Sequence, residues 1–308
     1  MEIVDTKIRL SRVVASIGKR VFSPAHATKA IRLQRNRKNA HRTASDAQLA
    51  LYGQMIGEFL HLGYFDSIDV EPTEISLGDI KRAQERYAER ILEFITDRDH
   101  LVLDVGCGMG GLLRMLEQRK FRVVGLTPDL NQVAYLKSTF RCPIIHARLE
   151  DYSDLKNQFG TIVAAESLQY LDRAQLLARI RQGLRPGGRW VLIDYLDKID
   201  GGSTRPSWEF VLRSLEEGGF SVIHNEDVTP HILPTVRFLH HLGQRFALPI
   251  FDFLTLKLEQ REPGISYLLG EILGDFRRVL RLNLSIVDPE KFALAKNYRL
   301  VVADLRHN

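Results

Sequence analysis

A glycine-rich run that directly follows a short apolar stretch constrains the fold more than any other feature of this chain. Residues 102–111 read Val-Leu-Asp-Val-Gly-Cys-Gly-Met-Gly-Gly, and helical spacing of apolar residues begins at Leu112. Gly106, Gly108 and Gly111 match G-x-G-x-x-G, in which glycines let the backbone approach a nucleotide closely. A strand, a glycine turn and a helix in this order predict the first unit of an α/β sheet.

Strand-like and helix-like segments alternate beyond this run. Apolar runs such as Phe121–Leu126 and Thr161–Ala165 are separated by segments with helical spacing, such as Asn131–Phe140 and Arg173–Leu184. Alternation with short connections predicts a doubly wound, Rossmann-like α/β fold with a mainly parallel sheet.

Two features distinguish the glycine loop from a dinucleotide site. Asp104 precedes the first glycine by two residues, where a carboxylate suits a ligand with an ammonium group better than a pyrophosphate. A dinucleotide site also expects an acid about 20 positions further on, at the end of the second strand. Gly125-Leu-Thr-Pro128 stands there, and the nearest acid, Asp129, follows the proline. A nucleoside with a cationic tail fits better, which is the chemistry of S-adenosylmethionine.

Several segments resemble those of one enzyme family. Leu103-Asp-Val-Gly-Cys-Gly-Met-Gly-Gly111 resembles the first motif of class I S-adenosylmethionine-dependent methyltransferases, and Arg185-Pro-Gly-Gly188 resembles the turn before their fifth strand. Gly125-Leu-Thr-Pro-Asp-Leu-Asn-Gln132 is similar to a run in the cyclopropane-fatty-acid synthase, tocopherol and sterol methyltransferase group. The resemblance covers about residues 50–306 and implies a seven-stranded sheet and S-adenosyl-L-methionine as cofactor.

The resemblance also implies which residues bind the cofactor. Thr127 and Gln132 are implied to hold the ribose, in place of the usual acid. Glu150, or Asp151 if the alignment slips by one residue, is implied to accept the adenine amine. The full expected set is Asp104, Gly106, Gly108, Gly110, Thr127, Gln132, Glu150, Asp151 and Glu166.

The segment Ala164-Ala-Glu-Ser-Leu-Gln-Tyr170 departs from the group's pattern. Glu166 and Ser167 match it, but Tyr170 stands where tocopherol and sterol enzymes have histidine. Gln169 lies near the position where cyclopropane synthases place a bicarbonate-binding glutamate, so methyl transfer is favoured over cyclopropanation. The candidate catalytic residues are Glu166, Tyr170 and His61. In the alternative interpretation, Glu166 only hydrogen-bonds neighbouring backbone amides.

The flanks of the glycine-loop core are predicted to be helical. Ala47–Leu62 and Lys81–Ile95 show helical spacing, residues 230–290 are rich in large apolar side chains, and Tyr298–Leu305 is typical of a strand. The histidines of residues 230–290 are interpreted as structural. The expected organisation is a basic amphipathic arm at 1–45, helices covering the cofactor site at 46–98, the cofactor-binding core at 99–229, a helical substrate cap at 230–292 and the last strand of the core at 293–308.

Charge is distributed unevenly. Residues 1–45 hold eleven Lys and Arg against two acids, whereas the whole chain has a net charge of +5. Leu10, Val13, Ile17 and Val21 recur in this arm at helical spacing. The arm is predicted either to lie on an anionic membrane or a protein partner, or to pack on its own domain. Nucleic acid is disfavoured because Phe22 is the only aromatic residue before Tyr52.

Composition and motifs limit the function classes. The two cysteines, Cys107 and Cys142, exclude a disulfide framework, and no apolar run reaches the length of a membrane span. A cytoplasmic location is therefore expected, with membrane association through the arm. The sequence predicts methyl transfer to a hydrophobic small molecule or lipid, on carbon or oxygen. The alternatives are a nucleic-acid methyltransferase recruited by the arm and a non-catalytic scaffold that binds the cofactor.

Overall fold

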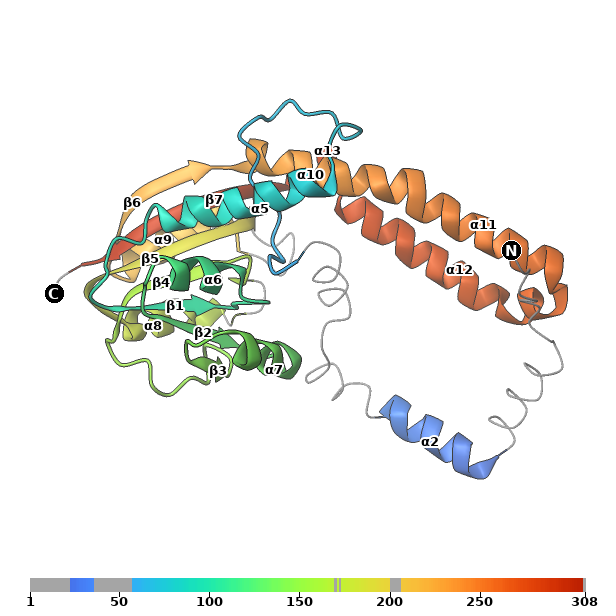
Figure 1. The fold of residues 1–308 in the computed structure, drawn as a ribbon, viewed down its shortest axis with the longest axis horizontal. Coiled ribbons are helices and arrows are strands. Elements are labelled where there is room, and N and C mark those ends of the chain that lie inside the picture. The colour runs from blue at the N-terminus through green and yellow to red at the C-terminus, as the bar shows by residue number, and fades with distance from the viewer. Residues whose placement is uncertain (1–22, 36–56, 169–170, 172, 200–205, 307–308) are drawn as a thin grey trace. The chain divides into compact units, whose positions relative to one another are not determined.

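The computed structural model describes residues 23–35, 57–168, 171, 173–199 and 206–306 (Figure 1). Seven strands form one sheet in the order β3-β2-β1-β4-β5-β7-β6. Neighbouring strands from β3 to β5 are parallel, and β7 is antiparallel to both β5 and β6. The predicted α/β fold with a mainly parallel sheet is therefore confirmed. In chain order the strands are β1 (Leu101–Val105), β2 (Val123–Thr127), β3 (Ile144–His146), β4 (Phe159–Ala165), β5 (Leu184–Asp197), β6 (Phe220–Asp227) and β7 (Lys296–Leu305).

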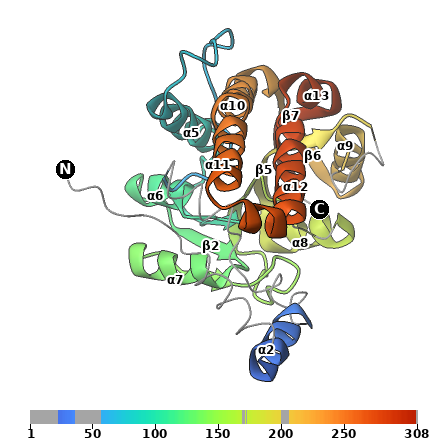
Figure 2. The same cartoon turned by 90° about the vertical axis from the view of Figure 1, so that its right-hand side faces the viewer.

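Helices cover both faces of this sheet because successive strand residues point to opposite sides. Val102 belongs to one apolar core and its neighbour Leu103 to the other. The core around Val102 includes side chains of α5 (Leu77–Leu92), α6 (Gly111–Gln118), α7 (Leu130–Thr139) and α10 (Thr229–Leu242). The core around Leu103 includes side chains of α8 (Arg173–Gly183) and α9 (Trp208–Glu217). Figure 2 shows α5, α6 and α7 on one side of the sheet and α8 and α9 on the other.

Helix α5 illustrates how local sequence fixes these elements. Ser76 caps its N-terminus, and the Asp79 side chain in turn accepts a hydrogen bond from the Ser76 amide, which is a capping box. Ile80, Tyr87 and Ile91 lie on one buried face because they follow a helical spacing. The helix was predicted to begin at Lys81; the capping box places its start at Leu77.

The insertion between β6 and β7 is helical, as predicted. After α10 come a short π-helical turn, η2 (Gly243–Ala247), and the helices α11 (Leu248–Arg261), α12 (Pro263–Ile286) and α13 (Pro289–Ala295). The chain divides into two compact units, one of residues 45–241 and 285–308 and the other of residues 1–44 and 242–284. Helix α2 (Pro24–Arg35) belongs to the second unit. Within the described residues, no helix combines the length and the apolarity needed to span a membrane.

One predicted helix is partly wrong. Residues 47–56 of the predicted helix Ala47–Leu62 lie outside the described residues, and residues 57–62 are not helical. Gln84 of α5 donates hydrogen bonds to the carbonyls of Phe59 and His61, at 3.1 and 2.7 Å. The Leu62 amide donates to Glu166 Oε1 at 2.8 Å. These long-range partners satisfy backbone groups that a helix would have paired internally, so tertiary contacts override the local apolar spacing.

Candidate functional site

The glycine loop lies between β1 and α6, at the carboxyl edge of the parallel strands. Gly106, Gly108 and Gly110 all have positive φ, at 76°, 54° and 87°. A Cβ at Gly106 would lie 2.8 Å from Ser167 Cβ, and one at Gly110 would lie 2.5 Å from the Phe140 ring. Only glycine combines this backbone conformation with such close neighbours. The loop therefore presents backbone, without side chains, at the edge where open α/β sheets bind ligands.

Asp104 lies in β1, beside this loop. Its side chain is 3% exposed, and burial alone raises its pKa to about 7. No positive side chain among the described residues contributes to this shift. An ionised carboxylate in such a place is costly unless a cation or several hydrogen-bond donors meet it. The Asp104 carboxylate would therefore be stabilised by a ligand group that is positively charged or rich in hydrogen-bond donors.

A covering segment, residues 58–66, lies across the glycine loop. A Cβ at Gly108 would meet Leu60 Cδ1 at 3.3 Å, and a Cβ at Gly111 would meet the Phe59 ring at 2.4 Å. Glu58 ion-pairs with Arg114 of α6, which fixes the start of the segment. The covering segment therefore closes one side of the loop against water.

Hydrogen bonds to α5 and α10 hold the rest of the covering segment. The Tyr64 amide donates to the Ala83 carbonyl at 2.8 Å, and the Phe65 amide donates to the His231 carbonyl at 2.9 Å. The His231 ring stacks on Tyr64, with 4.3 Å between ring centroids, and its Nδ1 bonds the Phe65 carbonyl. These contacts give His231 a structural role, which was the interpretation favoured for the histidines of this region.

Two of the predicted catalytic residues belong to or contact the covering segment. His61 is part of it, and Glu166 accepts a hydrogen bond from its Leu62 amide. The His61 ring stacks on Tyr87 at 3.9 Å, and its Nδ1 lies 2.8 Å from the Leu62 carbonyl, so Nδ1 carries the proton. Its Nε2 is buried without a hydrogen-bond partner among the described residues, and burial lowers the His61 pKa to about 4. Glu166 has a positive φ of 48° at the end of β4.

The predicted ribose and adenine residues lie at the ends of β2 and β3. Thr127 Oγ1 donates to Gln132 Oε1 at 2.6 Å, so these two side chains are brought together. Asp129 caps α7 through the amides of Asn131 and Gln132. Glu150 lies in the turn after β3 with a side chain that is 10% exposed, whereas Asp151 is exposed. The difference in burial favours Glu150 over Asp151 as the residue that would contact a base.

The comparisons with known proteins agree with this geometry. A profile of the methyltransferase domain matches residues 102–188. The chain is 26% identical over 251 residues to the O-methyltransferase cnsE of Penicillium expansum, which covers 71% of this chain and 87% of that protein. It is 30% identical to 27-O-demethylrifamycin SV methyltransferase of Amycolatopsis mediterranei over 49% of this chain, and spans 56% of that relative.

A solved structure shows the same fold. Geranyl diphosphate C-methyltransferase from Streptomyces coelicolor, in complex with Mg²⁺, geranyl-S-thiolodiphosphate and S-adenosyl-L-homocysteine, superposes with a TM-score of 0.57. It is 19% identical to this chain, and the match covers 83% of this chain and 91% of that one. The matching domain and the homologues are those of S-adenosylmethionine-dependent methyltransferases.

The residues of this methyltransferase fit its cofactor, S-adenosyl-L-methionine. Asp104 offers a buried carboxylate with no partner among the described side chains, which suits the cofactor's ammonium group. The loop from Gly106 to Gly110 presents bare backbone to a ligand, because a Cβ at either end would collide with Ser167 or Phe140. Neither feature depends on the resemblance, because both follow from burial and backbone geometry.

The structure also adds two residues that the sequence did not single out for the methyltransferase site. Tyr298 of β7 donates a hydrogen bond from its hydroxyl to Glu166 Oε1, and its hydroxyl lies 3.0 Å from that of Tyr87. The side chains of Tyr87, Tyr298 and Glu166, together with the Leu62 amide, form one polar network that reaches the covering segment. A buried tyrosine hydroxyl needs a partner, but no sequence signal connects positions 132 residues apart.

Proposed function

We propose that this methyltransferase methylates a hydrophobic small molecule, on oxygen or on carbon. The observation that carries the proposal is the buried Asp104 beside a glycine loop that presents bare backbone, because the two together suit the amino-acid part of the cofactor. The class of acceptor is supported by the relatives, whose names specify 27-O-demethylrifamycin SV and geranyl diphosphate. This chain spans only about half the length of these two relatives. We therefore infer only the class of the acceptor, a hydrophobic small molecule, and not its identity.

S-adenosyl-L-methionine supplies an electrophilic methyl group on a sulfonium, so the protein mainly positions an acceptor and excludes water. In our proposal, Asp104 and the loop from Gly106 to Gly110 hold the cofactor's amino-acid part. Thr127 and Gln132 hold its ribose, and Glu150 accepts the adenine amine. The covering segment keeps water away from the loop, since Phe59 and Leu60 lie against it.

We assign Glu166 to positioning rather than to proton transfer. Its Oε1 accepts hydrogen bonds from the Leu62 amide and from Tyr298, so it ties the covering segment to β4 and β7. This agrees with the alternative interpretation of Glu166 as a partner of backbone amides. Tyr170 lies outside the described residues, and its catalytic role stays a prediction.

We propose His61 as the proton acceptor when the nucleophile is a hydroxyl. Its Nδ1 proton is engaged by the Leu62 carbonyl, which leaves the lone pair on the buried Nε2. Because burial lowers the His61 pKa to about 4, this nitrogen stays unprotonated throughout the neutral and mildly acidic range.

The His61 assignment predicts an unusual pH profile. An ordinary histidine base would lose half of its activity near its usual pKa of about 6.5. With the pKa near 4, kcat should stay flat from pH 8 down to about pH 5.5. His61→Asn should lower kcat by roughly 10²-fold or more while cofactor affinity changes little. A titration of kcat near pH 6.5 in the wild type, or a variant with unchanged kcat, would contradict the assignment.

The acceptor class is tested with methyl-labelled S-adenosylmethionine. Purified protein and an extract of the source cells are incubated with the label, and the products are divided between organic and aqueous phases. We expect label in the organic phase, and less of it with Asp104→Asn at limiting cofactor. Nuclease-sensitive label in the aqueous phase would instead indicate a nucleic-acid methyltransferase.

We also propose that the protein is cytoplasmic and associates with membranes through the basic arm, residues 1–45. The described part of the arm, α2, carries Lys29, Arg32 and Arg35 and no acid. Neutralising Lys29 and Arg32 with glutamine should reduce the amount of protein that sediments with anionic membranes, which a sedimentation assay measures directly.

A further inference from the structure

Helices α11 and α12 form a helical hairpin with two different sides. On one side, the rings of Phe251 and Phe276 lie 5.3 Å apart. On the other side, Arg277 forms an ion pair with Asp252 at 2.8 Å. At the base of the hairpin, a Cβ on Gly243 would lie 1.8 Å from Leu284 Cδ2, so the chain packs closely there.

The side marked by Phe251 and Phe276 is apolar and exposed. On α12, Leu268, Ile272, Phe276 and Val279 follow one another at spacings of four, four and three residues, which places them on one face. They are 64, 64, 59 and 49% exposed. On α11, Ile250 and Leu254 lie one turn apart and are 54 and 58% exposed. No residue of α11 is buried at all.

This apolar surface is as large as the largest that a typical soluble monomer exposes. The six residues of this side, each about half exposed or more, together present on the order of 500 Å², and the largest patch on a typical monomer is about 300–600 Å². They are Ile250, Leu254, Leu268, Ile272, Phe276 and Val279.

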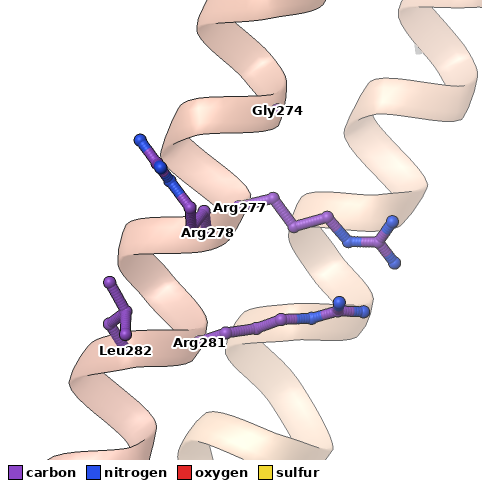
Figure 3. A pocket seen from close by; sticks show the side chains of 5 residues that line it. All are labelled: Gly274, Arg277, Arg278, Arg281 and Leu282. Carbon is purple, nitrogen blue, oxygen red and sulfur yellow. The ribbon is translucent and has the colours of Figure 1, made fainter.

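The opposite side of the hairpin is polar and rich in arginine. Arg277 and Arg281 reach across toward the neighbouring helix, whereas Arg278 and Leu282 point away from it (Figure 3). With Gly274 these side chains line a shallow surface hollow. Arg278 pairs with Asp275. The two helices together therefore form one amphipathic element, with an apolar side and a charged side.

Charge is strongly divided between the two compact units. Residues 1–44 and 242–284 hold 17 Lys and Arg against 7 Asp and Glu, a net charge of +10. The remainder of the chain holds 26 basic against 31 acidic residues, a net charge of −5. Most of this excess comes from residues 1–44, because residues 242–284 alone hold six Lys and Arg against five Asp and Glu. An anionic surface attracts such a unit, and a second copy of the same unit is repelled by it.

We propose that the hairpin of α11 and α12 docks the protein on an anionic lipid surface. Its apolar side enters the boundary between headgroups and acyl chains, and its arginine-rich side stays at the level of the phosphates and water. An element of this kind lies in the plane of the membrane, in keeping with helices that are too polar or too short to cross it.

The test uses the full chain and vesicles of phosphatidylcholine, with or without an equimolar amount of phosphatidylserine. We expect the protein to float with the phosphatidylserine vesicles and to be released as salt rises, because screening weakens the electrostatic part. Ile272→Glu with Phe276→Glu should lower the vesicle-bound fraction at least tenfold. The matched control is Gln244→Glu with Gln260→Glu, which adds the same two charges at exposed polar positions of this unit and should reduce binding much less.

Cofactor binding by calorimetry establishes that each variant is folded, and Phe276→Trp supplies a second measurement. No tryptophan lies in the hairpin of the wild type, so a blue shift of this probe on adding vesicles reports insertion of the apolar side. A concentration-dependent dimer that the paired Glu substitutions dissolve, without vesicle binding, would overturn the proposal in favour of an interface between copies. A monomer that binds no vesicles would overturn it outright. None of these readouts requires methyl transfer, so they are independent of the proposed acceptor.

Discussion

Asp104→Asn is expected to stabilise the cofactor-free protein above pH 7 and, at the same time, to weaken cofactor binding. Burial raises the pKa of Asp104 from 3.8 to about 7, so the folded state resists ionisation of this carboxyl group. Above pH 7 the ionised carboxylate costs the folded state about 4 kcal/mol at most. Asparagine removes that charge but leaves a buried amide to be satisfied, so we expect a net gain of about 1–3 kcal/mol.

The direction of the pH dependence follows from the raised pKa. Below about pH 4 the carboxyl group is protonated in both the folded and the unfolded chain, and variant and wild type should differ little. Between about pH 4 and 7 the folded wild type binds the extra proton, so its stability falls as pH rises. The advantage of Asp104→Asn should therefore grow across this window and then stay constant. Urea unfolding at pH 5 and pH 8 measures it.

Cofactor affinity should change in the opposite direction. Loss of a hydrogen bond to a charged group costs about 1.5–3 kcal/mol, or roughly tenfold to a hundredfold in affinity. Calorimetric titration with S-adenosylmethionine at pH 8 measures this loss. Asp194→Asn is the matched control, because Asp194 is fully buried and both of its oxygens accept hydrogen bonds from backbone amides. It should lose stability. An Asp104→Asn variant that is less stable at pH 8 than the wild type would refute our view of Asp104.

Gly110→Ala should destabilise the protein severely and abolish cofactor binding. Gly110 has a φ of 87°, and an added Cβ would lie 2.5 and 2.6 Å from the Phe140 ring and 2.8 Å from Leu136 Cδ2. The left-handed backbone costs a non-glycine residue about 1–2 kcal/mol. Overpacking adds about 1–3 kcal/mol. Together they should remove about 2–5 kcal/mol of stability, which chemical denaturation measures.

Gly274→Ala is the control for this substitution. Gly274 lies inside α12, and nothing occupies the space within 4 Å of an added Cβ. Alanine there should stabilise the protein by about 0.5–1 kcal/mol, because glycine is a poor helix former. Equal effects of the two substitutions would show that the loop around Gly110 tolerates a side chain, contrary to the packing described above.

The sequence predicted those parts of the site that depend on neighbours in the chain. The glycine loop, Asp104 and the two candidate ribose residues Thr127 and Gln132 all lie in or next to strand-to-helix turns, where local residues determine the backbone. The mainly parallel sheet was also predictable, because the alternation of strand-like and helix-like segments is visible in the local sequence. The roles of these residues toward the cofactor stay predictions that the experiments above test.

Other parts could not be predicted because they depend on distant partners. Residues 57–62 show helical spacing, yet their amides and carbonyls bond to Gln84 and Glu166, which only the folded chain brings near. Tyr298 meets Glu166 for the same reason. The apolar residues after position 242 were interpreted as a cap over the sheet; their exposure could not be read from a pattern that fits a buried helix equally well.

The strand order has a consequence for how the chain is assembled during synthesis. β7 follows every other described strand in the sequence but pairs between β5 and β6, with Val191 opposite Val302 on one side and Asn225 opposite Val301 on the other. β6 therefore has no partner until β7 has left the ribosome and inserted. Tyr298 arrives with β7, so Glu166 gains the hydrogen bond from this hydroxyl only then. The polar network of Glu166, Tyr87 and Tyr298 should therefore stay incomplete until β7 is made, a late step that long-range strand pairing also makes slow.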